Sequence, residues 1–276
     1  MWIVGNKPGL SDALTDIDPL VDHCNNLNDA HKQLLIKLYR QYHSKGYANS
    51  GELGPLSMVK GVIKGQYSKM YGNGTMGYIR YDLLRSVPSC PMCSINESAQ
   101  LDHFMHKEKY GQLACCRLNL VPTCGRCNRL KYEGEYTDFV HAYYDKFPNA
   151  DFLITTITVK NNNLGMVFQI DHSVFDDKDL ARRTQNQFQK LDLLVRLRKA
   201  GTTFLNDIIE SWTCSTERQL QEILRNEEER NMQTYGRNDW RTSIIRGLRA
   251  NQNFNIDVVN ARRKRKIPHN VNGGGA

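Results

Sequence analysis

The fold is decided by a stretch in the middle of the chain that reads Cys90-Pro91-Met92-Cys93, Leu101-Asp102-His103-Phe104, Asn119-Leu120-Val121-Pro122 and Cys124-Gly125-Arg126-Cys127-Asn128-Arg129-Leu130-Lys131. The stretch contains two Cys-x-x-Cys pairs, and thirty residues separate the first pair from the second. Each pair places two thiolates on one tight turn, and two such turns complete a tetrahedral site of four sulfur ligands. We therefore predict a structural zinc ion, Zn²⁺, held by Cys90, Cys93, Cys124 and Cys127.

The other cysteines fit a ligand role less well. Cys115 and Cys116 are the obvious rivals, but consecutive residues of an extended strand point in different directions, so we expect them to pack in the core. Cys24 and Cys214 are isolated and receive the same interpretation. The alternative for a Cys-x-x-Cys pair is a thioredoxin-like redox pair, which lacks its surrounding βαβ pattern here.

A structural zinc with four protein ligands has no open position, so it cannot activate water, and catalysis needs other residues. The Asp-His pair, the Asn-Leu-Val-Pro segment and the final Asn-x-x-Lys together resemble the HNH (ββα-metal, His-Me finger) endonucleases. The resemblance implies a β-hairpin and a following helix that hold one divalent ion. Asp102 matches the acidic metal ligand, His103 the general base, Asn119 the Asn that fixes the hairpin loop and the His orientation, and Asn128 the last motif position, a second metal ligand.

Oxygen ligands of this kind suit Mg²⁺ or Mn²⁺ better than zinc. A histidine with a pKa near neutrality can remove a proton from water that attacks phosphorus, while the cation neutralises charge on the phosphate. We also expect phosphate contacts from Arg126, Arg129 and Lys131, at the start of a helix whose dipole favours anions, and from Lys107. The resemblance implies 5′-phosphate and 3′-hydroxyl products.

One geometric condition accompanies this assignment. Neighbours on a regular strand point to opposite faces, so Asp102 and His103 both serve one site only if the chain departs there from regular pairing. His106, Lys107 and Glu108 also stand where many relatives have a proline and a small polar residue. His106 is either a second ligand or phosphate contact, or a loop histidine without a role. The resemblance covers only about fifty of the 276 residues.

The rest of the chain predicts an α+β, mainly α fold with four regions. These are a helical N-terminal region at 1–80, the HNH motif with its zinc site at 81–136, a β-hairpin plus helical C-terminal region at 137–260, and a basic, disordered tail at 261–276. Leu34, Leu35, Leu38 and Tyr42 recur at helical spacing behind a cap at Asn28.

Further signals lie after the motif. Two β-rich runs at 151–160 and 165–172, separated by Asn161-Asn162-Asn163-Leu164, predict a hairpin that packs on the centre. Helical spacing follows, with Phe204, Leu205, Ile208, Ile209 and Trp212 on one face, and Thr216 to Gln219 forms a capping box.

Composition agrees with a nucleic-acid partner. Lys and Arg outnumber Asp and Glu by 37 to 29, a net charge of +8, which favours a polyanion such as DNA. No run of eighteen apolar residues and no secretory signal occur, so we expect no membrane span and a cytoplasmic location.

The sequence therefore favours a metal-dependent HNH endonuclease acting on DNA. The resemblance suggests a bacterial restriction or anti-phage setting. Since the chain has no phosphate-binding loop of its own, ATP-dependent control would require a separately encoded ATPase or sensor. The alternative is a non-catalytic, zinc-stabilised module that binds nucleic acid or protein.

Overall fold

The computed structural model describes residues 7–132 and 134–265 and divides the chain into two compact units. Unit 1 consists of Met1–Phe147 and Asp177–Leu191, and unit 2 of Pro148–Asp176 and Asp192–Ala276. The region expected at 137–260 is therefore shared between the units. The structure has the mainly helical α+β composition that the sequence predicts.

Unit 1 begins with short helices around one long one. They are α1 (Leu10–Thr15), α2 (Ile17–Asp22), α3 (Asp29–Lys45), α4 (Ser50–Leu53), α5 (Lys60–Gln66) and α6 (Gly77–Arg85), with 3-10 helices η1 (Gly54–Val59) and η2 (Tyr67–Met70). The predicted cap of α3 is confirmed, because the Asn28 side chain accepts a hydrogen bond from the His31 N–H. Leu35, Leu38 and Tyr42 are buried as the spacing predicts, and Leu34 is half-buried.

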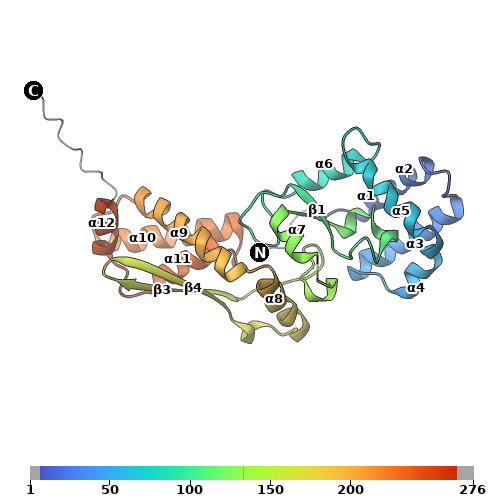
Figure 1. The fold of residues 1–276 in the computed structure, drawn as a ribbon. Helices are drawn as coiled ribbons and strands as arrows, with labels where there is room; N and C mark the ends of the chain where they lie inside the picture. Colours follow the sequence, from blue (N-terminus) through green and yellow to red (C-terminus); the bar gives the residue numbers. More distant parts are fainter. Residues whose placement is uncertain (1–6, 133, 266–276) are drawn as a thin grey trace, which may run out of the picture. The chain divides into compact units, whose positions relative to one another are not determined.

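The motif of unit 1 has the order strand, loop, strand, helix. Strand β1 (Gln100–His103) pairs antiparallel with β2 (Leu120–Thr123), and α7 (Gly125–Lys131) begins directly after β2 and lies against β1 (Figure 1). The loop at 104–119 contains the 3-10 helices η3 (Gly111–Leu113) and η4 (Arg117–Asn119), which pack against α5 and α3 respectively.

Two contacts fasten this loop and the end of unit 1. The guanidinium of Arg117 pairs with the buried carboxylate of Asp16, with Nη2 at 2.7 Å from Oδ1. Helix α8 (Lys178–Lys190) packs against η5 (Tyr136–Asp138), and Gln187 Oε1 accepts a hydrogen bond from the Val140 N–H at 3.1 Å. Helix α8 therefore belongs to the unit that carries the motif, although a whole hairpin separates it from that motif in sequence.

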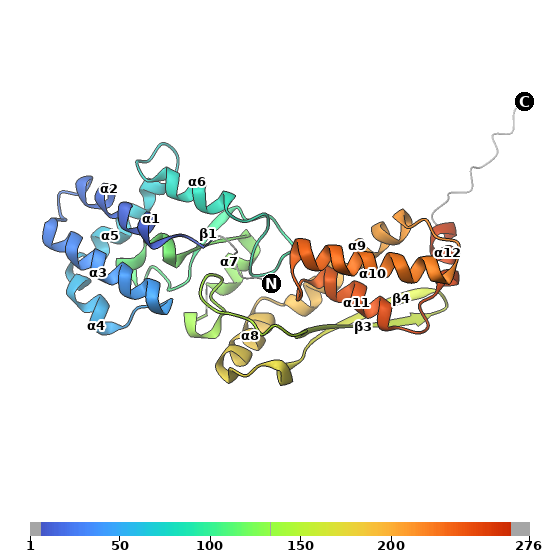
Figure 2. The same ribbon diagram turned by 180° about the vertical axis from the view of Figure 1, so that it is seen from behind.

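Unit 2 is a β-hairpin packed against helices. Strands β3 (Leu153–Lys160) and β4 (Asn163–Ile170) are joined by Asn161 and Asn162, whose φ values of 50° and 59° suit a tight hairpin turn. The hairpin is thus predicted correctly. Helix α11 (Trp240–Ala250) lies on β3 and α9 (Leu193–Ser211) on β4, so the hairpin packs against these helices within unit 2 (Figure 2).

The last helices of unit 2 are α10 (Glu217–Tyr235) and α12 (Ile256–Arg265), and η6 (His172–Val174) follows β4. The predicted capping box between Thr216 and Gln219 is present. Leu205, Ile208, Ile209 and Trp212 are buried as expected, and Phe204 is half-buried. Of the region 261–276, expected to be a disordered tail, residues 261–265 continue α12, while 266–276 lie outside the described residues.

The length and hydropathy of the helices indicate whether any of them could cross a membrane. Within the described part of the chain, no helix combines the length and the apolar character that crossing a bilayer requires.

Candidate active site

Four cysteines converge at the base of the motif, as their spacing predicts. Cys90, Cys93, Cys124 and Cys127 are buried, and their four sulfur atoms all lie within 4.8 Å of one another. A tetrahedral zinc with Zn–S bonds of about 2.3 Å separates its sulfurs by about 3.8 Å, and the Cys93 and Cys124 sulfurs are 3.9 Å apart. The donor set and its spacing fit structural zinc.

Backbone geometry explains why the cysteines meet. In the first Cys-x-x-Cys turn, the Ser94 N–H donates to the Cys90 carbonyl at 2.8 Å. Ser94 has a left-handed φ of 55° that closes this turn. In the second, Cys124 caps α7, and its sulfur accepts a hydrogen bond from the Cys127 N–H at 3.4 Å. Cys115 and Cys116 are buried outside the cluster, which agrees with their predicted packing role.

Asp102 and Lys131 form a buried ion pair between β1 and α7. Lys131 Nζ lies 2.9 Å from Asp102 Oδ2, and the two residues are 3% and 5% exposed. The ammonium also donates to the carbonyls of His103 and Phe104, each at 3.1 Å. Lys131 was expected to contact phosphate; in the structure its ammonium is instead buried against β1, because its spacing on α7 turns it onto the strand.

His103 is the last residue of β1 and is 7% exposed. Its Nε2 lies 3.0 Å from the Ala114 carbonyl, and its ring meets the Tyr67 ring edge-on at 4.5 Å. Because a carbonyl oxygen only accepts, Nε2 carries the proton and the lone pair of the neutral ring is on Nδ1. Burial lowers the pKa of His103 to about 3, with a smaller contribution from Lys107 and Lys131, so the imidazole stays neutral.

Asn119 makes hydrogen bonds to two residues of the loop, Met105 and Leu113. Its side chain is fully buried; Oδ1 accepts from the Met105 N–H at 2.8 Å and from the Tyr42 hydroxyl at 3.0 Å. Its Nδ2 donates to the carbonyls of Met105 and Leu113. The Asn119 amide therefore bonds Leu113, the residue directly before Ala114, whose carbonyl contacts His103.

Asn128 lies one turn before Lys131 on α7. Its Nδ2 donates to Gln100 Oε1 at 2.8 Å, while Lys131 contacts Asp102. Gln100 and Asp102 are two residues apart and share one face of the strand. Helix α7 therefore covers this face of β1 with its two polar side chains.

The geometric condition stated for Asp102 and His103 is not met. Asp102 pairs with Val121 and His103 with Leu120 in regular antiparallel register, and the Phe104 N–H still bonds to the Asn119 carbonyl. Asp102 faces Lys131 on α7, whereas His103 faces Tyr67 on the opposite side. The structure thus brings Asp102 and Asn128 to one face of β1, and His103 and Asn119 to the loop side.

The fit of a divalent cation is partial. Asp102 Oδ2 is a buried carboxylate oxygen that, among the described residues, accepts no well-directed hydrogen bond, which is the kind of atom an oxygen-seeking cation binds. It is the single carboxylate of this face, however, and Lys131 already balances its charge. Asp102, with Asn128, would hold Mg²⁺ or Mn²⁺, but a preformed cluster of three or more such acidic, His or Cys ligands is seen in the described chain only at the four cysteines.

The other predicted cationic contacts lie nearer the surface. Arg126 and Arg129 are exposed on α7. Lys107 is half-buried, with Nζ 4.8 Å from the centre of the Tyr67 ring that packs on His103. His106 is half-buried against Tyr132, and desolvation lowers its pKa.

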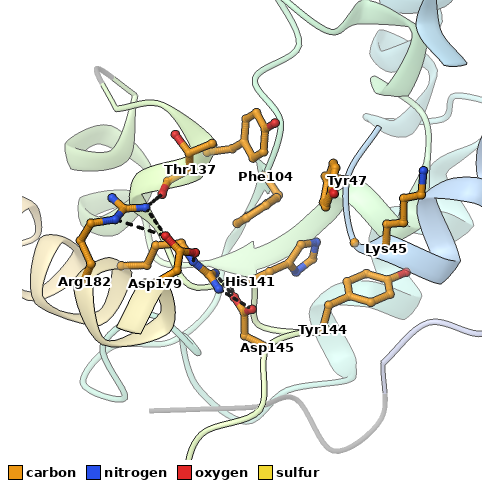
Figure 3. Close-up of a pocket in the computed structure, with 12 residues that line it drawn as sticks. Lys45, Tyr47, Phe104, Thr137, His141, Tyr144, Asp145, Asp179 and Arg182 are labelled. Carbon is orange, nitrogen blue, oxygen red and sulfur yellow. Dashed lines mark hydrogen bonds and ion pairs between the residues drawn. The ribbon is translucent and has the colours of Figure 1, made fainter. Parts of the chain in front are cut away.

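A cavity of about 430 Å³ opens beside Phe104, within unit 1. Figure 3 shows Phe104 and His141 between the Arg182 and Asp179 pair on one side and Lys45 on the other. Each cation lining the cavity is balanced by a carboxylate: Lys45 by Glu52 at 2.9 Å, Arg182 by Asp179 at 2.6 Å, and Arg183 by Asp145 at 2.9 Å. Its charges therefore compensate one another, and we assign it no ligand.

A directed hydrogen-bond chain runs from this cavity to the loop. The Tyr143 N–H donates to His141 Nδ1, so neutral His141 carries its proton on Nε2, which lies 3.2 Å from the Tyr42 hydroxyl. The Tyr42 hydroxyl in turn donates to Asn119. His141 is buried, and desolvation holds its pKa well below the usual range, with a smaller contribution from Lys131.

Sequence reasoning missed Gln100, Tyr42, Tyr67 and His141. Strand alternation placed Gln100 on the face of Asp102 and could have identified it. The helical pattern predicted that Tyr42 is buried, but nothing local indicated its partners, 77 and 99 residues away. Tyr67 and His141 gave no sequence signal.

Comparison with known proteins adds a distant relative. The chain is 29% identical over 126 residues to protein ea31 of Escherichia phage lambda, in an alignment covering 39% of this chain and 43% of that protein. The chain thus spans less than half the length of this relative. No family model matches the chain, and no solved structure matches it. The site defines a strand, strand, helix motif closed by four cysteines, and protein ea31 is a distant homologue.

Proposed function

We propose that the chain is a metal-dependent endonuclease of the HNH kind that hydrolyses phosphodiester bonds in DNA. The observation that carries the proposal is the arrangement around His103: the Asn119 side chain bonds Met105 and Leu113 of the loop, and the carbonyl of Ala114, the next residue, accepts from His103 Nε2. At the position that the HNH resemblance gives to the general base, the structure has a neutral histidine whose lone pair is on Nδ1. The similarity to protein ea31 supports distant homology alone.

The chain's own residues have distinct parts in the proposed reaction. His103 Nδ1 takes the proton from the attacking water, and the Ala114 carbonyl, which accepts from Nε2, keeps the ring in place. Arg126 and Arg129 contact the phosphate backbone from the exposed side of α7. Asp102 and Asn128 are the residues that would hold the divalent ion. When bound, that ion supplies charge neutralisation at the phosphate and the leaving oxygen.

The test is cleavage of supercoiled plasmid with Mg²⁺ or Mn²⁺. We expect His103→Ala to abolish cleavage while zinc content and circular dichroism stay unchanged. His106→Ala is the matched control, because His106 lies in the same loop, half-buried against Tyr132, and should retain activity. Cleavage by His103→Ala at the wild-type rate would refute the assignment of the base.

A second candidate, a non-catalytic zinc module that binds nucleic acid or protein, is favoured by one observation. Asp102 and His103 face opposite sides of β1, and Lys131 occupies the side of Asp102. A binding module predicts no cleavage with any divalent ion, together with DNA binding that survives Asp102→Ala. Under both candidates, replacing Arg126 and Arg129 by Ala should reduce the salt dependence of DNA affinity by about two units of slope.

The biological setting remains an expectation from the resemblance. A restriction or anti-phage effector would work with a separately encoded ATPase or sensor, and co-purification from the native host is the direct test. The relative found here is a phage protein, so it lends no support to a defence role.

A further inference from the structure

Lys131 is the most buried cation of the motif, and it forms the ion pair with the motif's acidic residue, Asp102. Its ammonium contacts three oxygens, Asp102 Oδ2 and the carbonyls of His103 and Phe104, at 2.9 to 3.1 Å. The aromatic rings of Phe104 and Phe139 flank it, each with its centre 5.6 Å from Nζ. These contacts hold the ammonium at one place rather than leaving it to sample solvent.

The ammonium stands where a divalent ion would bind. Asp102 Oδ2 is buried and, within the described chain, accepts no well-directed hydrogen bond, so its interaction with Lys131 is mainly one of charge. A cation that binds this oxygen directly approaches Nζ to within a few ångströms, and like charges at that distance in a buried site repel strongly. The two cations therefore exclude each other while Lys131 keeps this position.

We infer that the Lys131 ammonium occupies the cation position at Asp102 and sets the metal affinity of the site. A divalent ion then binds Asp102 only when the Lys131 side chain leaves it. The inference rests on the proposed function, since it concerns the metal site of that function. Lys131 reaches Asp102 from the last residue of α7. Its departure would also release the two carbonyls at the end of β1, next to His103.

The first test measures Mn²⁺ binding to the full, zinc-loaded chain by the paramagnetic resonance signal of free Mn²⁺. Lys131→Met keeps a similar side-chain volume but removes the charge. We expect it to bind Mn²⁺ about tenfold more tightly or better, because the binding-competent state no longer requires Lys131 to leave. Lys109→Met removes an exposed cation of the loop at 104–119, one paired with Glu135, and should leave the affinity near that of the wild type. Asp102→Asn should remove the binding in both backgrounds.

The second test uses the wild-type chain and does not depend on the folding of a variant. Acetylation of lysines, followed by mass spectrometry, should find Lys131 protected without divalent ions and reactive with saturating Mn²⁺, relative to the exposed Lys37. Zinc content measured in parallel shows that the four-cysteine cluster is intact in both samples.

Three outcomes would overturn the inference: equal Mn²⁺ affinity of Lys131→Met and the wild type, Mn²⁺ binding to Lys131→Met that is absent or independent of Asp102, and protection of Lys131 that persists at saturating Mn²⁺. Failure of the proposed function is distinguishable, because it appears as an absence of His103-dependent plasmid cleavage. If cleavage depends on His103 while Lys131→Met binds Mn²⁺ as the wild type does, the endonuclease proposal stands and the inference about Lys131 falls.

Discussion

The buried side chain of Asn119 connects several residues of unit 1 through hydrogen bonds. It makes hydrogen bonds to Met105, Leu113 and Tyr42 and is fully buried. Truncation leaves several buried polar groups without partners, and each such group costs about 1 to 3 kcal/mol. We expect Asn119→Ala to lower the free energy of unfolding by about 3 kcal/mol or more, measured by urea denaturation.

Asn128→Ala is the matched control for this prediction. Asn128 is half-buried and makes its hydrogen bond to Gln100 near the surface, so its loss should cost less than about 1 kcal/mol. Equal losses for the two variants would mean that Asn119 does not clamp the loop.

His141 gives the protein a sensitivity to acid. Burial holds its pKa well below the usual value in the folded chain, whereas the unfolded chain binds a proton near pH 6.5. As pH falls below about 6.5 the unfolded state therefore binds more protons, and the free energy of unfolding decreases by up to about 1.4 kcal/mol per pH unit for each such histidine. His103, with its pKa lowered to about 3, acts in the same direction.

Urea denaturation between pH 7 and 4.5 measures this loss. We expect His141→Gln to flatten the acid slope relative to the wild type, because one buried group that resists protonation is gone. The exposed His23 provides the control, and His23→Gln should keep the wild-type slope. A His141→Gln slope as steep as that of the wild type would contradict the prediction.

At the scale of elements, α11 approaches β3 more closely than side chains usually allow. A Cβ placed on Gly247 would lie 2.3 Å from the Thr155 carbonyl oxygen, which is backbone and cannot move aside alone. Ser243, one turn before Gly247 on α11, adds to the contact, since its hydroxyl donates to the Leu153 carbonyl at 2.7 Å. The helix and strand of unit 2 therefore meet through small residues.

Gly247→Ala should destabilise the chain despite the higher helix propensity of alanine, because the strain of separating α11 from β3 exceeds the gain of about 1 kcal/mol. Thermal unfolding should show a lower midpoint. Gly65→Ala in α5 is the matched substitution, with open space around the added methyl group, and should leave the midpoint unchanged or raise it. A raised midpoint for Gly247→Ala would show that the two elements separate without cost.

At the scale of the whole molecule, the two units should respond separately to loss of zinc. The four cysteines join the beginning and the end of the motif in unit 1, and none of them belongs to unit 2. We expect chelation of zinc, or Cys90→Ser, to raise amide hydrogen exchange in β1, β2 and α7 strongly while β3, β4 and α11 keep their protection. Mass spectrometry of peptides from the two units measures this.

Cys115→Ala serves as the control, since Cys115 is buried outside the cluster and should retain one zinc per chain by colorimetric release. Loss of protection spread evenly over both units would show that the cluster supports the entire chain. Zinc bound by Cys90→Ser at the wild-type level would refute the four-cysteine site itself.

Features that neighbouring residues encode could be predicted from the sequence. Ligand spacing brought the four cysteines together, the caps at Asn28 and Thr216 began their helices, and two asparagines closed the hairpin of unit 2. Each of these features depends on residues a few positions apart on a turn, or on one ligand set, so their physical cause is visible in the sequence. The order of strand, strand and helix in the motif was expected from the resemblance to the HNH endonucleases.

Other features depend on contacts between distant parts of the folded chain. Folding pairs Lys131 with Asp102, sets Asp102 and His103 on opposite faces of β1, links Tyr42 and His141 to Asn119, and places the hairpin in unit 2 and α8 in unit 1. These contacts join residues up to 99 positions apart. Periodicity reports which face of an element is buried, but the partner of a buried polar side chain depends on how distant elements pack, because that packing alone places its donors and acceptors.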